Sequence, residues 1–424
     1  MTTGMPARVA LINLGCRVNR VETDLVANKL QRAGCELVGQ EEADLVIINT
    51  CAVTGEAQTK TRKAVRHASR LPNAPQVLAT GCVANLFADE LLSVAHKLVI
   101  ETKKDLVAGK ALELLGRAGD YVDDKGVLAV SPTPTGRTRP GIKIQDGCNN
   151  RCSFCIVWKA RGPSRSLAST QVIEAIHEAC EHNAREVVLT GINLGSYRAP
   201  LGDELGHGAD LPVLLEHILS STSVERIRLS SIEPPDVTQR LLGVMAASAG
   251  RIAPFLHVCL QSGCDATLKR MRRVYDTEAF MDMVRMSRGL VHGIALETDV
   301  IVGFPGETDQ EFEASYEFCK EVRFSRMHVF RYSKRPGTPA AEFADQVDPR
   351  LMAQRSSRLR TLGEQMRAEN MRELVGTKGR VLVQSPGRAV SQELYDVTVD
   401  SRHPVGDLVE VEFTCLQDGV LVGN

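Results

Sequence analysis

A run of three closely spaced cysteines constrains this chain more than any other feature. Cys148, Cys152 and Cys155, here called the central cysteine set, follow the pattern C-x3-C-x2-C in one loop. Three thiolates are one fewer than a tetrahedral zinc site or a fully ligated iron–sulfur cluster requires. A [4Fe-4S] cluster held by three cysteines leaves one iron open to a small molecule. The pattern therefore favours an enzyme over a simple electron carrier.

A zinc knuckle is the structural alternative for the central cysteine set. Zinc sites usually pair a C-x2-C with a second pair of cysteines or histidines about 12–20 residues further on. The next cysteine after Cys155 is Cys180, which lies within a helical pattern. The sequence therefore favours an iron–sulfur cluster.

The composition is that of a multidomain globular protein. The 424 residues are 43% hydrophobic and 24% charged, and they contain no apolar stretch that could span a membrane. Because the first residues lack a secretion signal, the twelve cysteines indicate metal binding in a cytoplasmic protein rather than a disulfide framework. The net charge of −1 neither supports nor excludes binding to nucleic acid.

The N-terminal region, residues 1–118, alternates buried strands with amphipathic helices. Strands are predicted over 8–14, 44–49 and 76–79, and the main helices over 20–33 and 56–70. This alternation is typical of a doubly wound parallel sheet in an α/β domain.

A cysteine follows each of those three strands. Cys16, Cys51 and Cys82, here called the N-terminal cysteine set, lie just beyond the predicted carboxyl ends. Those ends gather along one edge of a doubly wound sheet, where ligands bind. We therefore expect a second three-thiolate site, although each cysteine taken singly could be an ordinary buried residue. Burial is our interpretation for the remaining cysteines: Cys35, Cys180, Cys259, Cys264, Cys319 and Cys415.

Three further regions follow the first domain. A linker rich in Pro and Gly is predicted over 119–139, and a second strand–helix series over 140–347 predicts a complete or partial (β/α) barrel. A polar, arginine-rich helix is predicted over 348–375, and a small β-barrel over 376–424. The arginines could follow RNA phosphates, or they could belong to a solvated helix face with interleaved glutamates.

The central cysteine set, with Phe154 before its last member, resembles the pattern of radical S-adenosylmethionine (SAM) enzymes. The wider sequence resembles the methylthiotransferase branch of that superfamily over essentially the whole chain, and residues 376–424 are similar to an RNA-binding TRAM barrel. The stretches that carry the resemblance are 15–19, 49–54, 80–82, 161–166, 229–234, 260–264 and 299–308.

The residues around Cys16 resemble one subgroup of this family. Gly15-Cys16-Arg17-Val18-Asn19 is similar to enzymes that act on N6-threonylcarbamoyladenosine at position 37 of tRNA. Relatives that act on isopentenyladenosine typically have Gln-Met after the cysteine, and those that act on a ribosomal protein have Pro-Lys. These two substrates remain alternatives, as does a non-catalytic iron–sulfur or zinc RNA-binding protein. Trp158 and Arg331 stand where relatives usually carry proline, which bears on loop shape and RNA contacts.

The resemblance implies SAM and two [4Fe-4S] clusters as cofactors, with one cluster on each cysteine set. Reductive cleavage of SAM at the central cluster would produce a radical that removes hydrogen from C2 of the adenine. The N-terminal cluster would hold the sulfur. The resemblance also implies tRNA as substrate, an electron donor such as flavodoxin or ferredoxin, no membrane partner, and no catalytic residue beyond the cluster ligands.

Three residues at predicted strand ends are candidates for contacts with SAM. Gly191 lies in a turn where a missing side chain would let the backbone approach a ligand. Glu233 and Gln261 follow later strands and could reach the ribose or sulfonium region. A purely structural role at the barrel rim is the alternative for all three.

Overall fold

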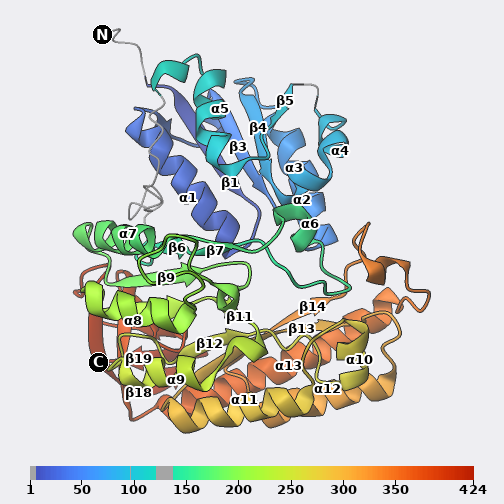
Figure 1. Cartoon of the computed structure of the whole chain (residues 1–424), viewed down its shortest axis with the longest axis vertical. Coiled ribbons are helices and arrows are strands. Elements are labelled where there is room, and N and C mark those ends of the chain that lie inside the picture. Colours follow the sequence, from blue (N-terminus) through green and yellow to red (C-terminus); the bar gives the residue numbers. More distant parts are fainter. Residues whose placement is uncertain (1–5, 96, 121–136) are drawn as a thin grey trace.

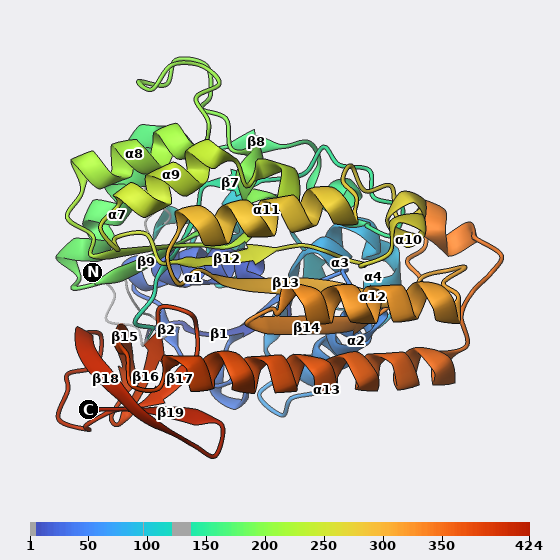
Figure 2. The same ribbon diagram turned by 90° about the horizontal axis from the view of Figure 1, so that it is seen from below.

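The structure is a computed structural model that describes residues 6–95, 97–120 and 137–424. An N-terminal sheet domain is followed by a central unit of parallel strands and a closed C-terminal barrel. In Figure 1 the N-terminal domain (blue) lies above the central unit (green to orange). In Figure 2 the barrel (red) lies at one end of the long helix α13. Among the described helices, none combines the length and apolarity that a membrane crossing needs.

Five parallel strands form the N-terminal sheet in the order β2-β1-β3-β4-β5. Alternate residues of the buried strand β3 belong to two different apolar clusters, so helices cover both faces, as predicted for a doubly wound sheet. The elements are β1 (Arg8–Asn13), α1 (Arg17–Arg32), β2 (Glu36–Leu37), β3 (Leu45–Thr50), α2 (Gly55–Ala68), β4 (Gln76–Gly81), α3 (Cys82–Leu86), α4 (Ala88–Leu92), β5 (Leu98–Ile100) and α5 (Val107–Leu114).

Helix α1 begins earlier than the sequence pattern predicted. It starts at Arg17 rather than residue 20, and the buried Val18 adds to its apolar face ahead of the predicted start. Cys16 is therefore the N-cap residue of α1, directly beyond the end of β1.

Seven parallel strands form the central unit in two adjoining sheets, β10-β9-β6 and β11-β12-β13-β14. Within the described residues β6 and β14 do not pair, so the barrel is partial. Helices pack outside the strands around one large apolar cluster (Figure 2). The strands are β6 (Gly141–Lys143), β9 (Glu186–Thr190), β10 (Arg226–Leu229), β11 (Ser231–Ile232), β12 (Phe255–Val258), β13 (Ala295–Val302) and β14 (Arg326–Arg331). The helices are α7 (Ser169–Glu181), α8 (Leu211–Ser221), α9 (Gln239–Ala247), α10 (Asp265–Arg270), α11 (Thr277–Leu290) and α12 (Asp309–Val322).

The loop that carries the central cysteine set lies between short elements at one end of this unit. Strands β7 (Gln145–Asp146) and β8 (Arg165–Ser166) pair antiparallel, and helix α6 (Val157–Arg161) lies between them in the chain. Because β7 and β8 are paired, the two ends of the segment that carries the central cysteine set lie side by side.

The last part of the chain is a long helix followed by a barrel. Helix α13 (Pro349–Leu374) starts at the N-cap Asp348 and packs on β14, and its Met371 reaches the core of the barrel. The barrel closes in the order β15-β16-β17-β19-β18, with β15 (Lys378–Ser385), β16 (Arg388–Ser391), β17 (Asp396–Thr398), β18 (Leu408–Gln417) and β19 (Val420–Gly423). Most of the predicted linker 119–139 lies outside the described residues, and the domain limits stay predictions.

Candidate functional site

All six cysteines of the two sets line one cavity of about 500 Å³. The N-terminal set comes from the carboxyl edge of the first sheet, and the central set comes from the loop between β7 and α6. In Figure 1 that edge of the N-terminal domain faces the central unit. The strand-end rule predicted the convergence of the N-terminal set. That the two sets share a cavity follows only from the packing of the domains.

Polar side chains fix the loops of the N-terminal cysteine set. Asn19 donates to Thr50 O at 2.8 Å and accepts a weak hydrogen bond from the Cys16 thiol at 3.5 Å. Thr50 Oγ1 donates to Thr80 O at 2.7 Å, which joins the ends of β3 and β4. Gly81 has φ +99° and no room for a Cβ, which would lie 2.4 Å from Thr50 O. These contacts hold the three cysteine-bearing turns together.

Backbone contacts fix the central cysteine set. Cys148 N donates to Gly162 O at 3.1 Å, and Val157 N donates to Cys155 Sγ at 3.4 Å. Gly147 has φ +73°, and a Cβ there would lie 2.0 Å from Pro163 O. The sequence after the last cysteine thus folds back over the first.

The buried thiols need a positive charge to ionise. Burial raises the pKa of Cys51 to about 11 and, with the neighbouring Cys152, that of Cys155 to about 12. Burial also raises the pKa values of Cys82 and Cys148. Thiols with pKa values this high are neutral at pH 7, so a metal that binds them must displace their protons. The convergence of three thiols within each set is what fits a metal cluster.

Arg273 supplies a fixed cation beside the central set. Its Nη1 donates to Cys152 Sγ at 3.0 Å, and its Nη2 forms a close ion pair with Glu233. Burial raises the pKa of the Cys152 thiol above its ordinary value, and the charge of Arg273 offsets part of this rise. Sequence reasoning missed Arg273, because it lies in the loop between α10 and α11, far from the cysteine pattern.

The three candidates for SAM contacts all line the cavity. The carboxylate of Glu233 is already held by Arg273. Gln261 has φ +67° and bridges to β13 through its backbone. A Cβ on Gly191 would lie 2.8 Å from Gln145 Oε1, which accepts from Ile192 N and Asn193 N. Each candidate therefore has a structural contact of its own.

Several buried polar atoms at the strand ends have no partner. Among the described residues, Thr190 Oγ1, Asn193 Oδ1 and Ser230 Oγ form no hydrogen bond, and all three residues line the cavity. Because buried polar atoms are normally paired, this arrangement is typical of a site for a polar ligand.

Two histidines face each other on the same side of the cavity. His257 Nε2 lies 3.1 Å from Asp299 Oδ1, and His328 closely contacts the buried Glu297. The ligand atoms of His257, Asp299 and His328 lie within 4.8 Å of one another, so they could also surround a cation. Isolated residues on separate strands gave no sequence signal for this cluster.

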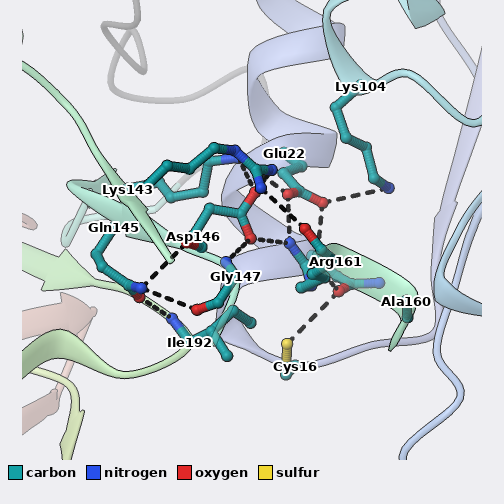
Figure 3. Close-up of polar contacts among 12 residues, drawn as sticks. Cys16, Glu22, Lys104, Lys143, Gln145, Asp146, Gly147, Ala160, Arg161 and Ile192 are labelled. Carbon is teal, nitrogen blue, oxygen red and sulfur yellow. Dashed lines mark hydrogen bonds and ion pairs between the residues drawn. The ribbon is translucent and has the colours of Figure 1, made fainter. Parts of the chain in front are cut away.

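A buried network of charges joins the N-terminal domain to the central unit beside the cavity (Figure 3). Arg161 donates to Glu22 Oε1 at 2.8 Å and to Asp146 Oδ1 at 2.9 Å. Lys104 and Lys143 form ion pairs with Glu22 at 3.2 and 3.0 Å. Burial alone would raise the pKa of Glu22, but the three cations hold it well below its usual range. The network ties the helix after Cys16 to the helix after Cys155.

The arginines of α13 are largely engaged within the protein. Arg355 is buried and pairs with Glu307 at 2.6 Å. Arg358 pairs with Glu313, and Arg367 lies 3.7 Å from Asp396. Of the two interpretations of this helix, the contacts favour the paired helix face over a free stripe for phosphates.

Comparison with known proteins places these features in a family. Residues 8–101 match the model described as uncharacterized protein family UPF0004, and residues 142–319 match that of the radical SAM superfamily. A threonylcarbamoyladenosine tRNA methylthiotransferase from Bacillus subtilis is 37% identical over 86% of this chain and 82% of its own length. A tRNA-2-methylthio-N(6)-dimethylallyladenosine synthase from Bordetella petrii is 32% identical over 94% of this chain and 87% of its own.

The fold is also found in a solved structure. A radical S-adenosylmethionine methyltransferase from Kitasatospora setae, with cobalamin and a [4Fe-4S] cluster bound, superposes with a TM-score of 0.55 at 17% identity. The match covers 79% of this chain and 77% of that chain. The two chains therefore share a fold over most of their length.

Proposed function

Because the chain belongs to the methylthiotransferase family of radical SAM enzymes, we propose that it adds a methylthio group to C2 of N6-threonylcarbamoyladenosine at position 37 of tRNA. One observation carries the proposal: two cysteine sets, each one ligand short of a filled cluster, line the same cavity. A reaction that removes hydrogen and adds sulfur at one carbon needs two such centres beside each other. The Bacillus subtilis relative and Arg17 after Cys16 support the choice of base.

We assign one [4Fe-4S] cluster to each cysteine set, and SAM to the strand ends at Gly191, Glu233 and Gln261. When bound, these groups supply one-electron chemistry at a carbon without an acidic proton, together with the sulfur and methyl group of the product. The convergence of three thiols in each cysteine set and the unpartnered atoms of Thr190 and Ser230 support the assignment.

The residues of this chain position the reacting groups. Arg161 and Glu22 hold the two cysteine sets in one orientation, because their contact joins the helices that follow each set. Arg273 offsets negative charge beside Cys152, and Glu233 holds Arg273 in place. Acid–base side chains are not required at C2, since its hydrogen leaves with one electron rather than as a proton.

The proposed partners follow from the chemistry. The substrate is a tRNA, as for the relatives of this chain. Reduction of a low-potential cluster requires a one-electron donor, for which we propose flavodoxin or ferredoxin. We also propose that the enzyme works in the cytoplasm, where tRNA is modified.

Mass spectrometry of tRNA nucleosides tests the function. A strain that lacks this gene, and any second enzyme of this kind, is expected to lose 2-methylthio-N6-threonylcarbamoyladenosine and to retain the unmethylthiolated nucleoside. The wild-type gene restores the product, whereas Cys51→Ala and Cys152→Ala variants do not. Persistence of the product would refute the proposal, and loss of the dimethylallyladenosine derivative instead would assign the other tRNA base.

A further inference from the structure

A second, basic cavity opens beside the cavity that contains the cysteines. It has a volume of about 310 Å³, and it shares Cys16, Arg17 and Thr190 with the larger cavity. Five arginines line it, whereas Asp24 is the one carboxylate among the described lining residues. The arginines are Arg17, Arg20, Arg137, Arg139 and Arg228. A pocket with this excess of positive charge fits an anion.

Arg17 is the arginine that faces both cavities. It is exposed, and within residues 6–95, 97–120 and 137–424 it forms no hydrogen bond or ion pair. Arg139 likewise has no such partner among the described residues. Arg228, in contrast, donates to Glu186 at 2.8 Å and to Gln392 O at 2.7 Å. Arg17 and Arg139 therefore present guanidinium groups whose donors are open to a ligand.

The acids nearest to Arg17 are already occupied. Glu297 and Asp299 are its electrostatic neighbours, but both lie beyond ion-pair distance from it. Glu297 contacts His328, and Asp299 contacts His257. Among the described residues, no ion-pair partner therefore cancels the charge of Arg17.

The substrate of the proposed function carries one anionic group close to the reacting carbon. In N6-threonylcarbamoyladenosine the threonyl carboxylate hangs from N6, on the same base edge as C2, whereas the phosphates lie across the sugar. The basic cavity adjoins the cavity of the two cysteine sets at Cys16, Arg17 and Thr190, so it lies within reach of an arm on a base bound there. Guanidinium groups bind carboxylates through paired, charge-assisted hydrogen bonds.

We propose that Arg17, supported by Arg139, binds the threonyl carboxylate of the substrate base and thereby selects the amino-acid-modified adenosine. This inference rests on the proposed function and adds the residue that recognises the N6 substituent. The basic cavity is the compartment that receives the carboxylate, and Cys16 places it directly beside the N-terminal cysteine set. The same cationic chemistry would suit a phosphate of the RNA backbone, so the test separates the two sources.

Binding of three anticodon stem-loop RNAs to the reconstituted enzyme, without reductant, tests the inference. They carry at position 37 the threonylcarbamoyl base, its neutral methyl ester, or unmodified adenosine. Wild type is expected to bind the acid about tenfold or more tightly than the ester. Arg17→Gln is expected to weaken binding of the acid about 10–100-fold, with the ester changed less than about twofold.

Arg8→Gln is the control. Arg8 is an exposed arginine at the opposite end of β1 from Cys16 and lines neither cavity, so its loss is expected to leave the preference for the acid unchanged. Arg17→Lys keeps the charge, and it is expected to retain part of the preference even if Arg17→Gln is poorly folded by thermal unfolding. Equal weakening of acid and ester, with a shallower salt dependence, would assign Arg17 to a phosphate and overturn the proposal.

Turnover by the wild type separates this inference from the proposed function. If wild type forms the 2-methylthio product but binds acid and ester equally, the carboxylate subsite is wrong and the function stands. If wild type modifies only dimethylallyladenosine, the function and the subsite are both wrong.

Discussion

Arg161 Nη1 donates to Glu22 Oε1 at 2.8 Å, although the two residues are 139 positions apart in the chain. The bond crosses from the central unit to the N-terminal domain, and both side chains are buried. Arg161 also donates from Nη2 to Asn19 at 2.7 Å, and Asn19 contacts the Cys16 thiol. One guanidinium group thus links the residues that follow each of the two cysteine sets.

Replacement of Arg161 tests this dependence. Arg161→Met leaves the buried Glu22 and Asp146 with less compensating charge, so the free energy of unfolding is expected to fall by about 3 kcal/mol. Urea denaturation measures it. Arg165→Met is the control, because Arg165 also pairs with Asp146 but its side chain is 58% exposed. That variant is expected to lose less than about 1 kcal/mol, and equal losses would contradict the special role of Arg161.

Glu186 predicts a stability change at acid pH. Burial alone would raise the pKa of Glu186. The charges of Arg228, Arg226 and Arg139 outweigh this effect and lower the pKa to about 2. Because the folded pKa lies below the unfolded value of about 4.3, Glu186 stabilises the fold above that value. This contribution, roughly 3 kcal/mol, is lost as the pH falls toward 2.

The pH prediction is checked by urea unfolding of the metal-free protein at several pH values. Glu186→Gln removes the titrating group, so the stability difference between wild type and variant is expected to shrink as the pH falls below about 4.3. If the stability difference stayed constant over this range, the pKa of Glu186 would be the same in the folded and unfolded states, which would contradict the prediction.

The iron content of reconstituted protein distinguishes ligands from buried cysteines. Wild type is expected to hold about eight irons, and Cys51→Ala and Cys152→Ala about four each, since each variant loses one cluster. Cys319→Ala is the control, because Cys319 is fully buried in the apolar cluster of the central unit. It is expected to keep about eight irons. Zinc without sulfide in the wild type would defeat the cluster assignment.

Replacement of Gly191 tests whether the close packing of this strand end against Gln145 is needed to bind SAM. In Gly191→Ala the added methyl group displaces Gln145 and the backbone amides that it holds, so SAM affinity is expected to fall about tenfold or more. Equilibrium dialysis with SAM measures this effect.

Gly243→Ala provides the comparison for Gly191. Gly243 lies in α9, and no described atom lies within 4 Å of the Cβ position. SAM affinity is expected to be unchanged, and stability is expected to rise by about 0.5–1 kcal/mol. If both alanine variants bind SAM like wild type, Gly191 has no role near the ligand.

Local patterns were sufficient to predict the architecture. Strand–helix alternation predicted the N-terminal sheet and the central series, because each element repeats with its own period of apolar residues. Boundaries moved, as at Arg17, where α1 begins earlier, and the short edge strands β2 and β5 were not among the predicted strands. The arginine-rich helix was also predicted, but its pattern did not reveal that Arg355 is paired with Glu307.

The sequence by itself determined the elements and the two cysteine sets, because spacing within a loop and position after a strand are local properties. The tertiary structure alone decided that both sets line one cavity and that Arg161 pairs with Glu22. It also left Arg17 without a hydrogen-bond or ion-pair partner among the described residues. These relationships depend on which distant side chains meet after burial has removed water. The pKa of a titratable side chain in the folded protein depends on its neighbours in space, and the order of residues does not specify those neighbours.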